Sequence, residues 1–293
     1  MAGLIERLTV LCFAGTYGLA LASDLARFAV RWSGRWYATV GLTVLGWVVQ
    51  TAYLANLWRG GAPPVRTPFE SLIVLSWVLA AIDIYLLVHS PRTGAAGLFV
   101  MPVVLGLTIA AAWSPRAGWV EGLGTGSPVI GFWGMAHGVL LVAGSVCSCV
   151  AFAAGLMYLV QSDRLKHKRP ARFGLVLPSL EQSERLNRGA ITVAFPLLTA
   201  GLVIGVILTV AVQRSEGAAI GWGDPKVIST LVMWVAFAVL LHARFRPAMR
   251  GRRVMVLSVV TFLFLAFSLF GVELLHLPTA HGGARTAAAG GRS

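Results

Sequence analysis

Eight long apolar stretches constrain this chain more than any other feature of its sequence. They lie at about Ile5–Ala22, Ala38–Leu57, Phe69–His89, Gly97–Trp113, Trp133–Val160, Ile191–Val212, Pro225–Leu241 and Val254–Leu275. Several of them approach or exceed about 18 residues, the length at which an apolar run predicts a transmembrane helix. Backbone polar groups must find hydrogen bonds inside the bilayer, which favours helices over open sheets. The sequence therefore predicts an all-α fold, a polytopic membrane helical bundle of about eight transmembrane helices.

The positive charge indicates how this bundle is oriented. The chain is 57% hydrophobic and only 12% charged, yet its net charge is +13. Lysine and arginine concentrate in the loops 24–37 and 162–189 and in the loop that follows His242. Such loops stay on the cytoplasmic side of a membrane. We therefore expect both termini outside an inner (plasma) membrane. We interpret the positive charge as a signal that orients the helices in the lipid bilayer, and it predicts no nucleic-acid partner.

The ends of the chain and two helix starts carry local signals. Ala20–Ala22 resembles a signal-peptide cleavage site, but a first transmembrane helix is the interpretation that agrees with the loop charges. Residues 1–281 are predicted to form a single transmembrane domain, and the Gly/Ala-rich tail 282–293 is predicted to be disordered. Thr67 to Glu70 reads as a capping box with proline at the first helical position. Asp224 followed by Pro225 predicts another helix N-cap.

Histidines inside or beside the spans are candidate ligands, because ionisable groups are costly in a membrane. His137 is expected near the outer face and His242 near the cytoplasmic face, so each needs a partner at its own level. The candidates are His276 or His281 for the first and His89 for the second. Paired imidazoles suit a six-coordinate haem. Zinc would need three or four ligands, and no suitable cluster is present in the sequence.

Two further observations leave alternatives open. Asp83 lies inside the third span, where it fits either a proton relay or a buried ion pair. Tryptophans gather in or beside the predicted outer loops, where they fit either an interfacial belt or a platform for a flat aromatic ligand. They are Trp58, Trp113, Trp119, Trp133 and Trp222.

Three stretches, taken in order, resemble the CcsA (ResC) and HemX-like cytochrome c assembly family of membrane proteins. The run 177–187 and Phe195–Leu198 match that family's LPSLE, RLN and FPLL segments. The run 224–244 matches its DPK, W and LHAR segments. Weaker matches occur at Phe69–Leu72 and Gly271–Leu275.

The resemblance implies a haem-handling protein whose outer, tryptophan-rich WWD motif presents haem b for attachment to apocytochrome c. Its outer axial histidines map onto His137 and His281, and the histidine of its LHAR segment maps onto His242. Trp222 and Asp224 fall in the WWD motif, with Trp119 and Trp133 as further aromatic candidates. His89 is the candidate for the other membrane histidine.

The motif departs from the family pattern. The family sequence reads like WGWDPKE, whereas this chain has GWGDPKV, with glycine at 221 and 223 and valine at 227. Two functions follow as alternatives. The first is haem delivery across the membrane, as a subunit of a cytochrome c haem lyase (synthase) that works with a ResB/CcsB-like membrane subunit. The second is a HemX-like regulator or assembly scaffold that has lost haem presentation. A small-molecule permease unrelated to haem is a more distant alternative.

Overall fold

The chain folds entirely into helices over the residues that its computed structural model describes, which are 2–28, 34–59, 65, 67–89, 97–114, 128–168, 177–216, 224–246 and 251–271. These residues form eight α-helices and no strand, which confirms the all-α prediction. The helices are α1 (Ala2–Leu25), α2 (Arg35–Trp58), α3 (Pro68–His89), α4 (Gly97–Trp113), α5 (Pro128–Lys166), α6 (Leu180–Glu216), α7 (Pro225–Phe245) and α8 (Arg252–Ala266). A 3₁₀ turn at Ala26–Phe28 follows α1, and a π-helical segment at Phe267–Gly271 follows α8.

The helices have the length and composition of membrane spans. Six of those described, α2, α3, α5, α6, α7 and α8 with its extension, are long and apolar enough to cross a bilayer. Two shorter apolar segments remain, which are α4 and the part of α1 from Val10 to Leu25. The chain is therefore a multi-pass helical membrane protein, as predicted.

The predicted boundaries are wrong for the two longest helices. The fifth span was expected to begin at Trp133, but α5 begins at Pro128 and continues to Lys166. The sixth was expected at Ile191, but α6 begins at Leu180 and continues to Glu216. Hydropathy marks the part of a helix that lies in lipid. Polar turns that continue the same helix beyond it carry no such signal. The tail 282–293 lies outside the described residues.

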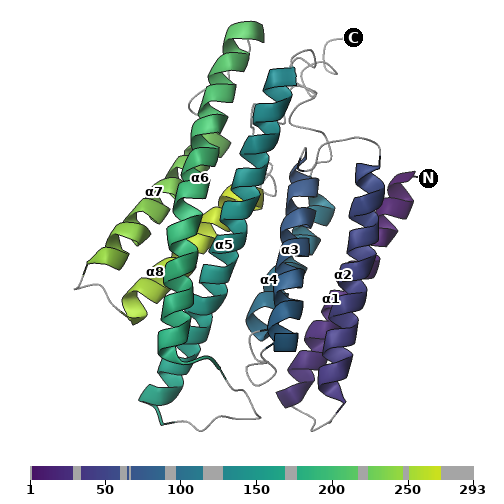
Figure 1. Cartoon of the computed structure of the whole chain (residues 1–293), viewed down its shortest axis with the longest axis vertical. Helices are drawn as coiled ribbons and strands as arrows, with labels where there is room; N and C mark the ends of the chain where they lie inside the picture. The colour runs from purple at the N-terminus through teal and green to yellow at the C-terminus, as the bar shows by residue number, and fades with distance from the viewer. Residues whose placement is uncertain are drawn as a thin grey trace, which may run out of the picture.

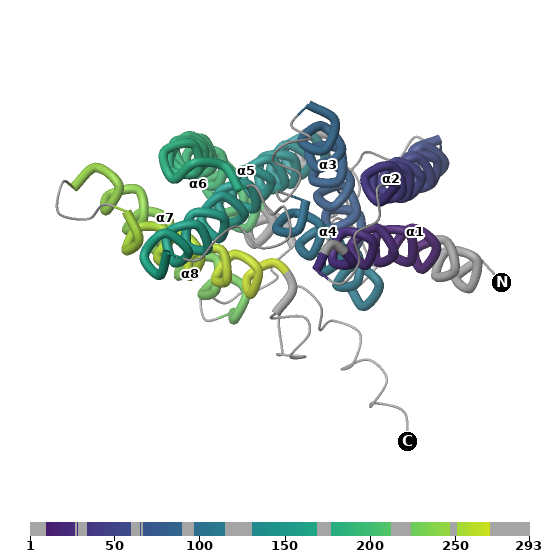
Figure 2. Tube along the Cα trace, turned by 90° about the horizontal axis from the view of Figure 1, so that it is seen from below, coloured from purple at the N-terminus to yellow at the C-terminus, as the bar shows by residue number. Residues whose placement is uncertain are grey.

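The bundle consists of two groups of four helices that meet at α5. In the first group α1 packs on α2 and α4, and α3 packs on the same two helices. In the second, α5 packs on α6 and α8, and α7 packs on the same two. Contacts of α5 with α3 and α4 join the groups, and Figures 1 and 2 show α7 and α3 on different sides of α5.

Consecutive helices run in opposite directions, so basic residues collect at one end of the bundle (the lower end in Figure 1). The helix ends that meet there carry Arg35, Arg164, Lys166, Arg185, Arg188, Arg244, Arg252 and Arg253. The flanks of the three basic loops therefore lie together, as the charge pattern requires. That this end faces the cytoplasm stays a prediction.

Both predicted N-caps are confirmed. The Thr67 hydroxyl accepts a hydrogen bond from the Glu70 backbone N–H at 3.0 Å, with Pro68 as the first residue of α3. The Asp224 carboxylate accepts from the Lys226 backbone N–H at 2.8 Å, and Pro225 opens α7. Each cap satisfies an amide at a helix start that has no partner within the helix.

Candidate functional site

The upper half of the α5–α6 pair holds His137, the central candidate ligand. Since α5 begins at Pro128, His137 lies about two and a half turns inside the helix. Its imidazole is partly buried against α6. There Nδ1 lies 2.7 Å from the carbonyl oxygen of Gly201.

Glycines on α6 make this contact sterically feasible. A Cβ atom at Gly205 would lie 2.7 Å from Cε1 and 3.0 Å from Nδ1 of His137. One turn away, a Cβ at Gly201 would lie 2.8 Å from a methyl carbon of Leu141. Small residues four apart let two membrane helices approach closely. The face of α6 at Gly201 and Gly205 therefore forms the surface, here called the seat, against which the imidazole of His137 packs.

The hydrogen bond to Gly201 fixes the chemistry of the ring. A carbonyl oxygen can only accept, so Nδ1 carries the proton, and in the neutral ring the Nε2 atom carries the lone pair. Histidines that ligate metals characteristically donate their other ring N–H to a backbone carbonyl or carboxylate, which orients the ring and raises its basicity. His137 thus has the tautomer and the support that an axial ligand of haem iron requires.

Exposed aromatic side chains lie one turn from His137. Trp133 precedes it by four residues, on the same face of α5, and its side chain is 47% exposed. Phe132 is also exposed and packs edge to face against Trp133, with ring centroids 5.8 Å apart. Trp113, at the same end of the bundle, is exposed at the end of α4. This surface can contact a flat apolar ligand, or the interfacial region of a bilayer.

Several predicted site residues lie outside the described residues. They are Trp119, Trp222, His276 and His281. Asp224, two residues after Trp222, is 7% exposed, and its carboxylate caps α7. Within the described structure Asp224 therefore fixes the start of α7, directly after the motif that contains Trp222.

The structure does not bring His242 and His89 together. His242 lies in the last turn of α7 with an exposed side chain, and His89 is the exposed last residue of α3. The His89 ring stacks on Tyr85 of its own helix, with centroids 4.3 Å apart, and its Nδ1 lies 3.2 Å from the Tyr85 carbonyl oxygen. Since α3 and α7 lie on different sides of α5 (Figure 2), these two histidines do not form a pair within the described bundle.

Arg244, two residues after His242, points into the protein instead. It is 8% exposed, and its Nη2 donates to the carbonyl oxygen of Glu184 on α6 at 2.6 Å. Positions two apart on a helix face different directions. The LHAR segment therefore presents its histidine outward and uses its arginine to hold α7 against α6.

Asn187 joins three helices, a role that sequence reasoning missed. It is fully buried on α6, and its Nδ2 donates to the Ala151 carbonyl oxygen at 2.7 Å and to the Ser258 hydroxyl at 2.9 Å. These acceptors belong to α5 and α8. The available signal in the sequence was a polar amide side chain close to an apolar span, which needs hydrogen-bond partners when it is buried.

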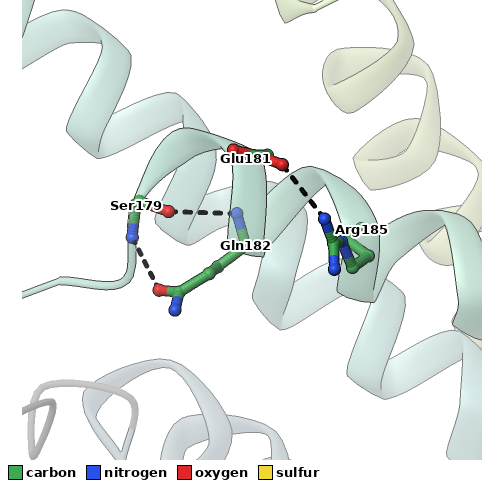
Figure 3. Close-up of polar contacts among 4 residues, drawn as sticks. All are labelled: Ser179, Glu181, Gln182 and Arg185. Carbon is green, nitrogen blue, oxygen red and sulfur yellow. Dashed lines mark hydrogen bonds and ion pairs between the residues drawn. The ribbon is translucent and has the colours of Figure 1, made fainter.

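The LPSLE segment forms the start of α6 (Figure 3). The Ser179 backbone N–H donates to Oε1 of Gln182 at 3.1 Å, and the Gln182 N–H donates to the Ser179 hydroxyl at 3.1 Å, which is a complete capping box. Glu181 pairs with Arg185 one turn on at 3.0 Å, on an exposed face. A serine followed three residues later by glutamine was the signal for this helix start.

Comparisons with known proteins identify the family of this chain. The family model described as "Cytochrome C assembly protein" matches residues 66–278. Proteins named cytochrome c biogenesis protein CcsA are similar over most of their length. One from Synechococcus sp. (strain CC9605) is 27% identical over 92% of this chain and 94% of its own. Those from Guillardia theta and Prochlorococcus marinus (strain MIT 9303) are 26% and 29% identical, over 82% and 80% of this chain and 83% and 80% of theirs. No solved structure matches the chain.

Proposed function

The chain belongs to the cytochrome C assembly protein family, and from that premise we propose that it presents haem b to apocytochrome c at the end of the bundle that holds His137. A role in cytochrome c assembly follows from the family and from the CcsA relatives. The proposal adds that His137 and His281 are the axial ligands of the presented haem, on the extracytoplasmic side of an inner membrane.

One observation carries this proposal. The Nδ1···O distance of 2.7 Å between His137 and Gly201 holds the ring in the tautomer whose Nε2 can ligate iron. Trp133, on the same face of α5, offers an aromatic surface beside that position. Haem is here the substrate, and the chemistry of thioether formation belongs to its vinyl groups and to the thiols of the recipient. The chain contributes a ligand, an orientation and an apolar surface.

The exposed position of His242 supports a second part of the proposal. Haem arriving from the cytoplasmic side is ligated by His242 at the lower end of α7. His89 lies on another side of the bundle, and His167 at the end of α5 bonds to Asp163 of its own helix turn, so we expect the second ligand at that level to come from outside this chain. A ResB/CcsB-like membrane subunit packed against α7 is the partner that fits this requirement.

The test is the absorption spectrum of the detergent-purified protein, co-expressed with its ResB-like partner, oxidised and then reduced with dithionite. His137→Ala should lower the haem content and alter the Soret band, and added imidazole should restore part of both. His167→Ala is the matched control, because this exposed histidine at the end of α5 bonds only within its own helix turn. Equal haem content and spectra in wild type and His137→Ala would overturn the ligand assignment.

A HemX-like scaffold is the second candidate, and the motif before α7 favours it. Gly221 and Gly223 stand where the family has tryptophans, so fewer rings are available there to stack on a porphyrin. This alternative predicts a protein without haem absorbance under the same co-expression. Replacing both glycines by tryptophan would then be expected to raise haem retention.

A further inference from the structure

A buried carboxyl group without any hydrogen bond lies in the first half of the bundle. Asp83, on α3, is 1% exposed, and among the described residues neither of its carboxylate oxygens has a hydrogen-bond partner. An ionised carboxylate in such a place is strongly disfavoured unless a ligand or an opposite charge compensates it. The Asp83 carboxyl group is therefore expected to bind a cation or a proton, and a proton is the smallest candidate.

A second carboxyl group from α1 reaches the same point. A Cβ atom placed on Gly97 would lie 3.2 Å and 3.7 Å from the two oxygens of Asp83, and 3.7 Å from Oδ2 of Asp24. Asp24 is itself 4% exposed, in the last turn of α1. The absence of a side chain at Gly97 thus leaves a space onto which both carboxyl groups converge.

The geometry of this space favours a proton on the pair. Two negative charges that face one apolar space disfavour each other, and Asp83 is buried there without a hydrogen-bond partner among the described residues. Gly97 is also the first residue of α4, and the positive end of that helix dipole stabilises the one negative charge that remains. The same dipole repels a metal cation. No group of three or more metal-ligating side chains occurs among the described residues.

Among the described residues, the neighbouring elements supply hydroxyl and amide groups near this space, and α2 begins with Arg35 one turn before Thr39. From α1, Tyr17 lies seven residues before Asp24 on the same helix face, and its hydroxyl donates to Oε1 of Gln50 at 2.6 Å. Gln50 in turn donates to Ser76 at 2.8 Å, seven residues before Asp83 on its face of α3. The other helices around Asp83 bring apolar or hydroxyl side chains to this level. From α2 these are Thr39 and Thr43, α4 has no ionisable residue, and α5 packs Ala154 and Met157 near Leu86.

We propose that Asp24 and Asp83 form a membrane-embedded proton-binding site that holds one proton at the start of α4. Tyr17 and Ser76, which are joined by hydrogen bonds to Gln50 of α2, lie on the same faces of α1 and α3 as the two carboxyl groups. They lead from this site toward the middle of the first four helices. The site is separate from His137 and uses different helices, so it is independent of the proposed function.

A hydrophobic carbodiimide tests the proposal, because such reagents modify protonated carboxyl groups in apolar surroundings. The full-length protein would be labelled in detergent over a range of pH, and the modified residue identified by peptide mass spectrometry. We expect labelling of Asp83 or Asp24 that declines as the pH rises. The exposed Glu181, paired with Arg185, should stay unlabelled and serves as the internal control.

Two variants and one competition make the test decisive. Asp83→Asn should abolish labelling at the site and remove the infrared C=O stretching band of a protonated carboxyl group. Gly97→Ala should reduce labelling, since its new methyl group occupies the space between the two carboxyl groups. Absence of labelling at every pH, or labelling that does not change with pH, would overturn the proposal. So would protection by sodium or magnesium salts at constant pH, which would indicate a metal cation in place of the proton. None of these readouts requires haem.

Discussion

Gly205→Ala should displace the imidazole of His137 although it replaces none of the candidate ligand residues. The new Cβ would lie 2.7 Å from Cε1 and 3.0 Å from Nδ1 of that ring, closer than non-bonded atoms approach. The ring is the side chain of another helix and is bonded to the Gly201 carbonyl oxygen at 2.7 Å. It can relieve the clash only by leaving this hydrogen bond, or by moving α5 away from α6.

The size of the effect follows from these two routes. Overpacking of an interior usually costs about 1–3 kcal/mol. Loss of the hydrogen bond costs a further amount of about 0.5–1.5 kcal/mol. If His137 is the axial ligand, loss of the partner that orients it should weaken iron binding about 10- to 100-fold. The variant should therefore be moderately less stable and should bind haem much more weakly.

Haem titration of the apoprotein in detergent, followed by the Soret band, measures the second effect, and the thermal midpoint of unfolding measures the first. Gly189→Ala is the matched control, because it lies on the same helix with nothing within 4 Å of a new Cβ. We expect the control to bind haem as the wild type does. Wild-type haem affinity in Gly205→Ala, together with a lowered midpoint, would refute the inference that this seat orients an iron ligand.

Three further predictions test other parts of the structure. Asp224→Ala should lower the stability of the bundle by about 0.5–2 kcal/mol through loss of the α7 cap, measured by denaturant unfolding in detergent, whereas Asp163→Ala, at a half-exposed position late in α5, should have less effect. Asn187→Ala should cost about 1–3 kcal/mol, because it leaves the Ala151 carbonyl and the Ser258 hydroxyl without their donor, and wild-type stability would contradict the three-helix role. In a background without the native cysteines, Leu165→Cys should react with an impermeant thiol reagent only from the cytoplasmic side and Trp113→Cys only from the other side. The reverse pattern would invert the predicted topology.

Local signals in the sequence were sufficient for the helix starts that they mark. Thr67 and Asp224 each precede a proline at the first helical position, and both caps need only neighbours within three residues. The start of α6 was missed although Ser179 and Gln182 carry the same kind of signal. Hydropathy does not mark that start, because the first turns of α6 are too polar to belong to an apolar stretch.

Contacts between distant residues could not be predicted in the same way. His137 was recognised as an ionisable group in a span, but its acceptor Gly201 lies 64 residues further along the chain. The spacing of Gly201 and Gly205 indicates that some helix approaches closely, yet does not identify that helix. Asp24 was assigned to a loop because it follows an apolar run. Its burial beside Asp83 depends on how α1 packs against α4, which the composition of α1 does not specify.

Helical geometry also divides motifs that a sequence comparison treats as units. In the segment 241–244, His242 is exposed while Arg244 is buried and donates to the Glu184 carbonyl oxygen at 2.6 Å. The arginine therefore acts on the α6–α7 contact, whereas the histidine acts on whatever lies against the outer face of α7. Under the proposed function, a substitution at Arg244 should change haem handling only through the position of α7, while one at His242 should change it directly. One short turn of helix therefore carries both a side chain that holds α7 in place and a histidine that is open to a partner outside the bundle.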